Sequence, residues 1–182
     1  MADHRGAAYR SLPFRVTSGS LSVEFPAVPA SQWLSILTGE GGRRGVLQLL
    51  PAGQMDALLD ALSAGQATVQ DVSRITQSAV TEASGYPWWQ AEMLISSVVG
   101  EDRRILGGLV LAGVDPERIT LAAYCAAVWA LLTRNASEEG LMKLEAQMMT
   151  PPPGVDIDDL DEVEDFDAVA RRLRATPGAR VG

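Results

Sequence analysis

Few residues in this chain have the types and spacing that catalysis requires. His4 is the only histidine, and it lies close to the N-terminus, where few residues can hold a side chain in place. A Ser-His-Asp or Cys-His arrangement needs a base fixed within hydrogen-bond reach of its nucleophile. Cys125 is the only cysteine, whereas a zinc site needs three or four His, Cys or carboxylate ligands. We therefore expect a protein that is not an enzyme and that binds no metal and no cofactor.

Cys125 lies within an apolar run that is predicted to be helical, with alanines beside it and no cation close in sequence. Such a thiol is expected to be buried and inert. A chain with one cysteine forms no intramolecular disulfide, so nothing suggests an oxidising compartment. The first thirty residues lack the basic start and long apolar stretch of a signal peptide. The expected location is the cytoplasm of a bacterial cell.

Two other segments have residue types that can bind ligands. Residues 39–45 combine four glycines with Arg43 and Arg44, which could present backbone N–H groups and guanidinium groups to an anion. The spacing of a phosphate-binding loop is missing, so a flexible surface loop is the favoured interpretation. Trp88 and Trp89 could stack on a nucleotide base, but the absence of basic neighbours favours core packing instead.

The chain is acidic, and its excess acids are concentrated in one segment. The formal net charge is -8, from 15 Lys and Arg against 23 Asp and Glu. Residues 156–167 hold eight acids and no base, so the rest of the chain has no net charge. An acidic chain is repelled by a phosphate backbone and by anionic lipid headgroups. We therefore expect protein partners, with no nucleic acid and no membrane among them.

Residues 1–26 are predicted to form an N-terminal arm that contains a short β-hairpin. Apolar and polar residues alternate on both sides of the turn sequence Thr17-Ser18-Gly19-Ser20, a pattern typical of two short strands within residues 12–25. The pattern leaves open whether these strands pair within the chain or with another copy. Because an isolated two-stranded hairpin is marginal in water, it must pack on the helices or on a neighbour.

Residues 27–149 are predicted to form a helical core domain. Apolar residues at helical spacing, together with start and stop signals, predict helices over residues 30–37, 55–62, 68–85, 87–99, 115–134 and 137–149. The start signals are the capping-box pair Thr68 and Asp71, the Asp115-Pro116 pair, and Ser137 before two acids. The large side chains predicted to fill the core are Trp33, Trp88, Trp89, Leu94, Tyr124 and Trp129.

Residues 150–182 are predicted to form a Pro-rich linker and an acidic tail with one short helix. Apolar residues in this tail recur at three- and four-residue steps, which would form one stripe on a charged helix. The stripe is a candidate partner-binding surface made of Leu160, Val163, Phe166, Val169 and Leu173. Packing of the stripe on the chain's own core is an equally good interpretation. The predicted fold class is thus mostly α: a multi-helix domain with a short N-terminal β-hairpin and an acidic C-terminal tail that carries one amphipathic helix.

Three features in residues 12–99 occur in an order that resembles a known family. They are the strand segment ending in Phe25-Pro26-Ala27-Val28-Pro29-Ala30 before Trp33-Leu34, the paired helices of residues 53–84, and the sequence Ser84-Gly85-Tyr86-Pro87-Trp88-Trp89, which leads into Ala91 and Leu94. In this order they resemble the tail assembly chaperones of long-tailed, siphovirus-type phages that infect actinobacteria. None of the three features is a catalytic signature.

The resemblance implies a late phage protein that works in the host cytoplasm without catalysis. Such a protein would bind the tape measure protein, keep its apolar helices soluble and promote polymerisation of the major tail tube protein. It would leave before the virion is complete. Self-association, or binding to a frameshift-extended form of the same protein, would also fit. The alternative hypothesis is a structural tail or head-tail connector protein that is retained in the virion.

Overall fold

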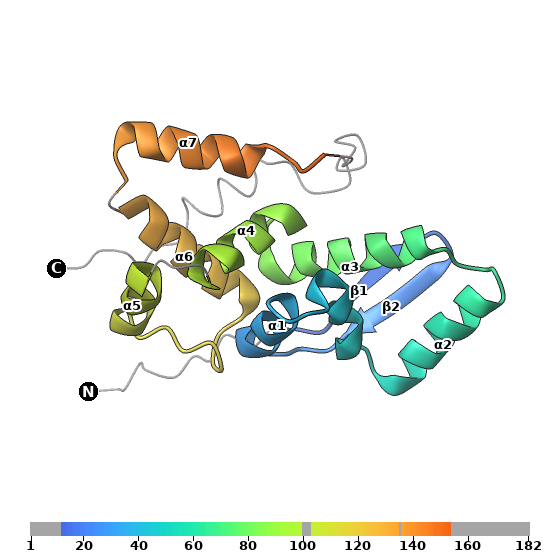
Figure 1. The fold of residues 1–182 in the computed structure, drawn as a ribbon. Coiled ribbons are helices and arrows are strands. Elements are labelled where there is room, and N and C mark those ends of the chain that lie inside the picture. The colour runs from blue at the N-terminus through green and yellow to red at the C-terminus, as the bar shows by residue number, and fades with distance from the viewer. Residues whose placement is uncertain (1–11, 100–102, 135, 154–182) are drawn as a thin grey trace.

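The computed structural model describes residues 12–99, 103–134 and 136–153, and these form a mostly helical protein with an N-terminal hairpin (Figure 1). The elements, in chain order, are β1 (Phe14–Ser18), β2 (Leu21–Phe25), α1 (Ala30–Leu37), the 3₁₀ helix η1 (Gly42–Leu49), α2 (Ala52–Ser63), α3 (Val69–Ser84), α4 (Trp88–Val99), α5 (Arg103–Leu111), α6 (Leu121–Arg134) and α7 (Glu138–Met149). The predicted fold class is confirmed for this part of the chain. The predicted amphipathic helix of the acidic tail lies outside the described residues.

The hairpin pairs within the chain. β1 and β2 are antiparallel, with Phe14 opposite Phe25 and Val16 opposite Val23. The left-handed φ of +59° at Gly19 permits the tight turn between them. Val16, Val23 and Phe25 are buried, and the hairpin packs on α3. The ring of Phe25 lies 5.5 Å from that of Phe14 and 6.4 Å from that of Trp33, so an aromatic cluster joins the hairpin to α1.

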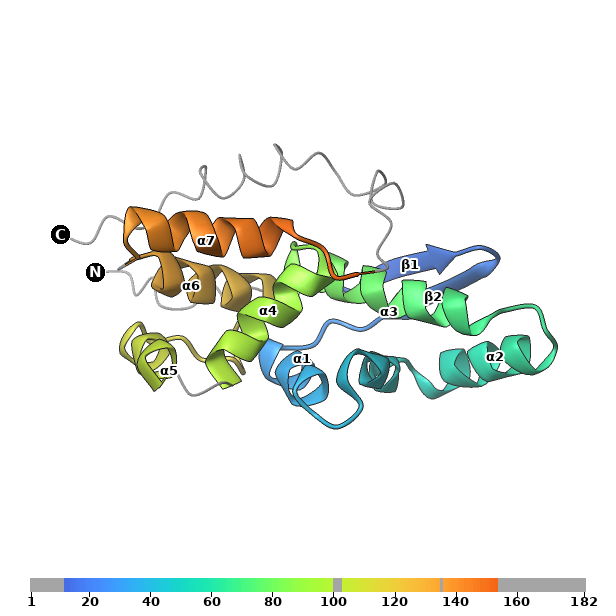
Figure 2. The ribbon, with the colours of Figure 1, turned by 45° about the horizontal axis from the view of Figure 1, so that its top comes forward.

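α3 is the central helix of the molecule. It contacts both strands on one side, and η1, α4 and α6 elsewhere along its length (Figure 2). Its side chains Ile75, Ala79 and Val80 are fully buried. The predicted capping box is confirmed, because the Thr68 hydroxyl accepts the Asp71 N–H at 3.1 Å and the Asp71 carboxylate accepts the Thr68 N–H at 2.9 Å.

The side chains that were predicted to fill the core lie at two depths. Trp33, Trp88, Leu94 and Tyr124 are buried, whereas Trp89 and Trp129 are half-buried. All except Trp33 belong to α4 and α6, which pack together. We refer to α4, α5, α6 and α7 as the helical half of the molecule. This half and the hairpin share one hydrophobic core, because buried residues of both belong to the same cluster.

The predicted helix start at Asp115 is wrong, since α6 begins at Leu121. In the segment before α6, two backbone carbonyl groups accept hydrogen bonds from the first turn of α1 and do not take part in a helix. Ile119 O accepts the Ala30 N–H at 2.9 Å, and Pro116 O accepts the Ser31 N–H at 3.0 Å. Pro29, the cap residue of α1, offers no side-chain cap, so these carbonyls satisfy amides that the first turn leaves free.

Two further segments differ from the sequence-based expectation. Residues 42–49 form the 3₁₀ helix η1, where a flexible loop was expected over residues 39–45. α5 is a helix that the sequence pattern did not predict, because Gly107 and Gly108 lie at its centre and glycine disfavours helices. A Cβ at Gly108 would lie 3.0 Å from Leu131 Cδ2 of α6. The missing side chain therefore permits the close approach of α5 and α6.

Removal of the Asp71 carboxylate should reduce stability in a pH-dependent way. Hydrogen bonds from the Thr68 hydroxyl and N–H hold the pKa of Asp71 below its usual value. A lowered pKa in the folded state means that the ionised form stabilises the fold above about pH 4, and that this stability is lost as pH falls through the lowered pKa. In urea titrations, the stability gap between wild type and Asp71→Ala should be large at pH 6 and should narrow toward pH 2.5.

The matched control is Asp60→Ala, which removes an exposed acid from α2. This variant should stay within about 0.5 kcal/mol of the wild type at pH 6. A gap for Asp71→Ala that is the same at both pH values would contradict the assignment of the capping carboxylate.

Candidate functional site

The residues that could do covalent or metal chemistry are not assembled in the described part of the chain. Cys125 is fully buried, and burial raises the pKa of its thiol to about 12, which keeps it protonated. His4 lies outside the described residues. Among residues 12–99, 103–134 and 136–153, no group of three or more His, Cys, Asp or Glu side chains could hold a metal ion. Within the same ranges, no helix is both long and apolar enough to cross a bilayer.

The predicted partner-binding stripe also falls outside the described residues. This applies to all of its members, Leu160, Val163, Phe166, Val169 and Leu173. The candidate sites that the structure does describe are two exposed apolar surfaces, one small pocket and one groove.

α5 presents an exposed apolar surface at one end of the molecule. Ile105 and Leu109 point into the core, whereas Leu106, Val110 and Leu111 are exposed by 53%, 69% and 91%. Leu106 and Val110 are four residues apart, so they are neighbours on one face of the helix. We refer to Leu106, Val110 and Leu111 as the α5 face. The four-residue spacing of Leu106 and Val110 is a signal in the sequence that could have identified this face.

α7 lies on the outside of the helical half and carries a second exposed apolar surface (Figures 1 and 2). Met142 and Met149 are exposed and, seven residues apart, share one face. Near the C-terminal end of α7, Met148 is buried, and its backbone oxygen accepts two side-chain hydrogen bonds from α4. The donors are Trp89 Nε1 at 3.1 Å and Gln90 Nε2 at 2.9 Å. The polar edge of Trp89 therefore attaches α7 to α4.

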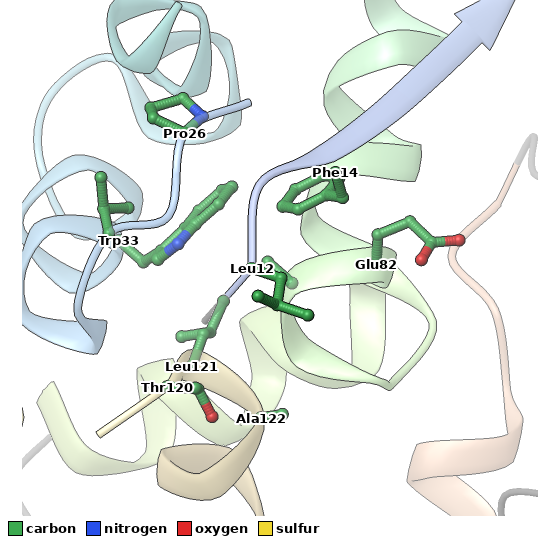
Figure 3. Close-up of a pocket in the computed structure, with 10 residues that line it drawn as sticks. Leu12, Phe14, Pro26, Trp33, Glu82, Thr120, Leu121 and Ala122 are labelled. Atoms are coloured by element: carbon green, nitrogen blue, oxygen red, sulfur yellow. The ribbon is translucent and has the colours of Figure 1, made fainter. Parts of the chain in front are cut away.

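A small pocket lies where the start of β1 meets α1, α3 and the start of α6 (Figure 3). Its volume is about 190 Å³, and its walls include Phe14, Trp33 and Leu121. Glu82 of α3 is the one acid in its lining. Pockets that bind small molecules are usually larger, at roughly 300–1,000 Å³. This pocket has room for little more than one apolar side chain.

Arg43 fastens η1 to α4. Its guanidinium carbon lies 3.6 Å from the ring centroid of Trp88, a cation–π geometry, and Nη1 lies 3.5 Å from Glu92 Oε1. Burial lowers the pKa of Arg43 and raises the pKa of Glu92, while their mutual attraction opposes both shifts. Arg43 is thus part of the structure, and not the free anion-binding group that the glycine-rich sequence left possible.

A groove with a larger volume than the small pocket lies between η1 and the N-terminal half of α3. We call it the η1–α3 groove, and its volume is about 790 Å³. Arg43 and Arg44 line it from η1, Val69 and Val72 line it from α3, and its lining contains no acid. No sequence pattern predicted this groove, because its two walls come from segments that are distant in the chain and meet only after folding.

Arg43→Ala should lower the free energy of unfolding by about 1–3 kcal/mol. The variant loses the cation–π contact, which contributes about 0.5–2 kcal/mol, and the packing of the side-chain stem. Arg44→Ala is the matched control. The Arg44 side chain is exposed, so its removal should change the free energy of unfolding by less than about 0.5 kcal/mol. Chemical denaturation of both variants checks this, and equal midpoints would contradict a fastening role for Arg43.

A Trp89→Phe, Gln90→Met double variant should loosen α7 without affecting α3. Both donors to Met148 O are removed, and each such bond contributes about 1 kcal/mol. Amide hydrogen exchange in the C-terminal half of α7 should accelerate by roughly 30-fold, since every 1.4 kcal/mol is a factor of ten. Gln90→Met alone should have a smaller effect. Unchanged exchange in α7 would show that other contacts hold the helix.

Comparison with known proteins found no match to this chain among protein families, curated protein sequences or solved structures. Its function is therefore inferred from its exposed surfaces and from the order of sequence features in residues 12–99.

Proposed function

We propose that this chain is a phage tail assembly chaperone that binds the tape measure protein in the host cytoplasm. The observation that carries the proposal is the α5 face, where three large aliphatic side chains are more than half exposed on one short helix. Contiguous exposed apolar residues are typical of protein-binding surfaces. The exposed methionines of α7 add flexible apolar side chains, which adapt to partners of varied shape.

Helix-in-groove or helix-against-helix contact is the recognition mode that suits such surfaces. An amphipathic helix of a partner buries its apolar residues against exposed Leu, Val and Met side chains. The apolar helices of a tape measure protein have this chemistry, and covering them would prevent their aggregation. The proposed role needs no covalent step.

The proposed partners come from the sequence resemblance. The order of features in residues 12–99 resembles that of tail assembly chaperones, and it points to the tape measure protein first and the major tail tube protein second. The net charge of -8 supports a holding role, because like charges on loaded complexes keep them apart. The acidic stripe around Phe166, which lies outside the described residues, is a second proposed contact.

A charge placed in the α5 face should break the complex. In Leu106→Lys, the new ammonium group would have to be buried against the apolar partner, which should weaken binding by about tenfold or more. Leu59→Lys is a matched control, since Leu59 of α2 is 52% exposed against 53% for Leu106 and α2 lies at the opposite end of the molecule (Figures 1 and 2).

The measurement is co-expression with the large helix-rich protein encoded immediately downstream, followed by purification through a tag on this chain. The wild type and Leu59→Lys should each bring down soluble partner, whereas Leu106→Lys should leave most of it insoluble. If both proteins are soluble alone and form no complex, the chaperone proposal is wrong. If Leu106→Lys binds as well as Leu59→Lys, the partner uses a surface other than the α5 face.

A further inference from the structure

The η1–α3 groove has a mixed chemistry that suits a particular kind of peptide. Arg44 is exposed, and within the described residues it makes no ion pair. Arg43 lies beside it and is partly neutralised by Glu92. On the opposite wall, Val69 is 78% exposed and lies close to Val72 in the lining. A ligand that fits must therefore combine acids with large apolar side chains.

One segment of this chain has that combination. Residues 156–167 hold eight acids and no base, and the apolar residues Leu160, Val163 and Phe166 are interleaved among them at three-residue steps. Everywhere else the charges of the chain balance, so this segment is the strongest acidic counterpart that the chain offers to the exposed Arg44. We propose that residues 156–173 dock in the η1–α3 groove of the same molecule, with their acids on Arg44 and their apolar stripe on Val69, Val72 and Leu47.

The connecting chain is long enough for this arrangement. The described chain ends at Pro153, after α7, and six residues separate it from Leu160. Six residues span up to about 20 Å when extended, whereas a helix with its side chains is about 10–12 Å across. Figures 1 and 2 both place the end of α7 and η1 on opposite sides of α3. The linker therefore needs to pass only one helix.

Docking of the tail would have a defined effect on the molecule. It would cover the exposed apolar side chain of Val69. It would also neutralise the exposed base Arg44. A partner that presents acids on an amphipathic segment would have to displace the tail. While docked, the stripe would not be available to the tape measure protein, so this inference competes with the second contact proposed above and leaves the contact at the α5 face unaffected.

The test is a spin-label measurement on the full-length protein. Ala168→Cys supplies the label site, since at helical spacing position 168 falls off the apolar stripe. The native Cys125 does not compete for the reagent, because it is fully buried. Loss of amide signal near the label is recorded in isotope-labelled protein at low ionic strength. The amides of η1 and of residues 69–76 should lose intensity, whereas those of the α5 face should not.

Two charge reversals and a mixing experiment make the result decisive. Arg44→Glu should restore the groove signals, whereas Arg118→Glu, at an exposed arginine outside the groove, should not. About 1 M salt should also restore them, because the Debye length falls to about 3 Å. Signal loss at other surfaces only, or at none, would overturn the proposal. So would signal loss that appears when spin-labelled and isotope-labelled molecules are separate chains, since the tail would then occupy the groove of a second copy.

Discussion

Burial of α3 between the hairpin and the helical half is the constraint on which the other elements depend. Ile75, Ala79 and Val80 are fully buried there, and each large aliphatic side chain so buried contributes about 1.5–3 kcal/mol. A hairpin of two five-residue strands is marginal by itself, so it depends on α3 for apolar cover. The Ser18 hydroxyl reinforces this contact by donating to the capping carboxylate of Asp71 at 3.3 Å. α4, α6 and η1 also pack against α3.

Local signals predicted those parts of the fold that depend on neighbouring residues. The strands, the capping box at Thr68 and the helix start at Ser137 each satisfy backbone groups within a few residues, so sequence alone identifies them. The errors arose where distant segments compete. Asp115-Pro116 has the residues of a helix start, but the nearby carbonyls bond to α1. Gly108 weakens α5 as an isolated helix, yet its missing Cβ permits contact with Leu131.

The surfaces proposed to bind partners were harder to predict than the fold. The acidic stripe rests on a local sequence pattern, and it stays a prediction because it lies outside the described residues. To predict the α5 face or the η1–α3 groove, one must know which side of a helix packs against the core. Arg43 illustrates the difficulty, since glycines around it suggested a mobile anion-binding loop, whereas Trp88, 45 residues later, fixes it. The two surfaces differ in chemistry, since the α5 face is aliphatic whereas the groove combines arginines with valines, so the ligands that we propose for them also differ.

The most direct test of the proposed role is quantitative mass spectrometry of a phage that encodes this chain, comparing lysates of infected cells with purified virions. A protein that acts on the tape measure protein during assembly and then leaves should be abundant in the lysate late in infection and missing from the particles. Recovery from purified virions at a fixed ratio to the major tail tube protein would contradict the chaperone role, and would identify the chain as a structural component of the tail or connector.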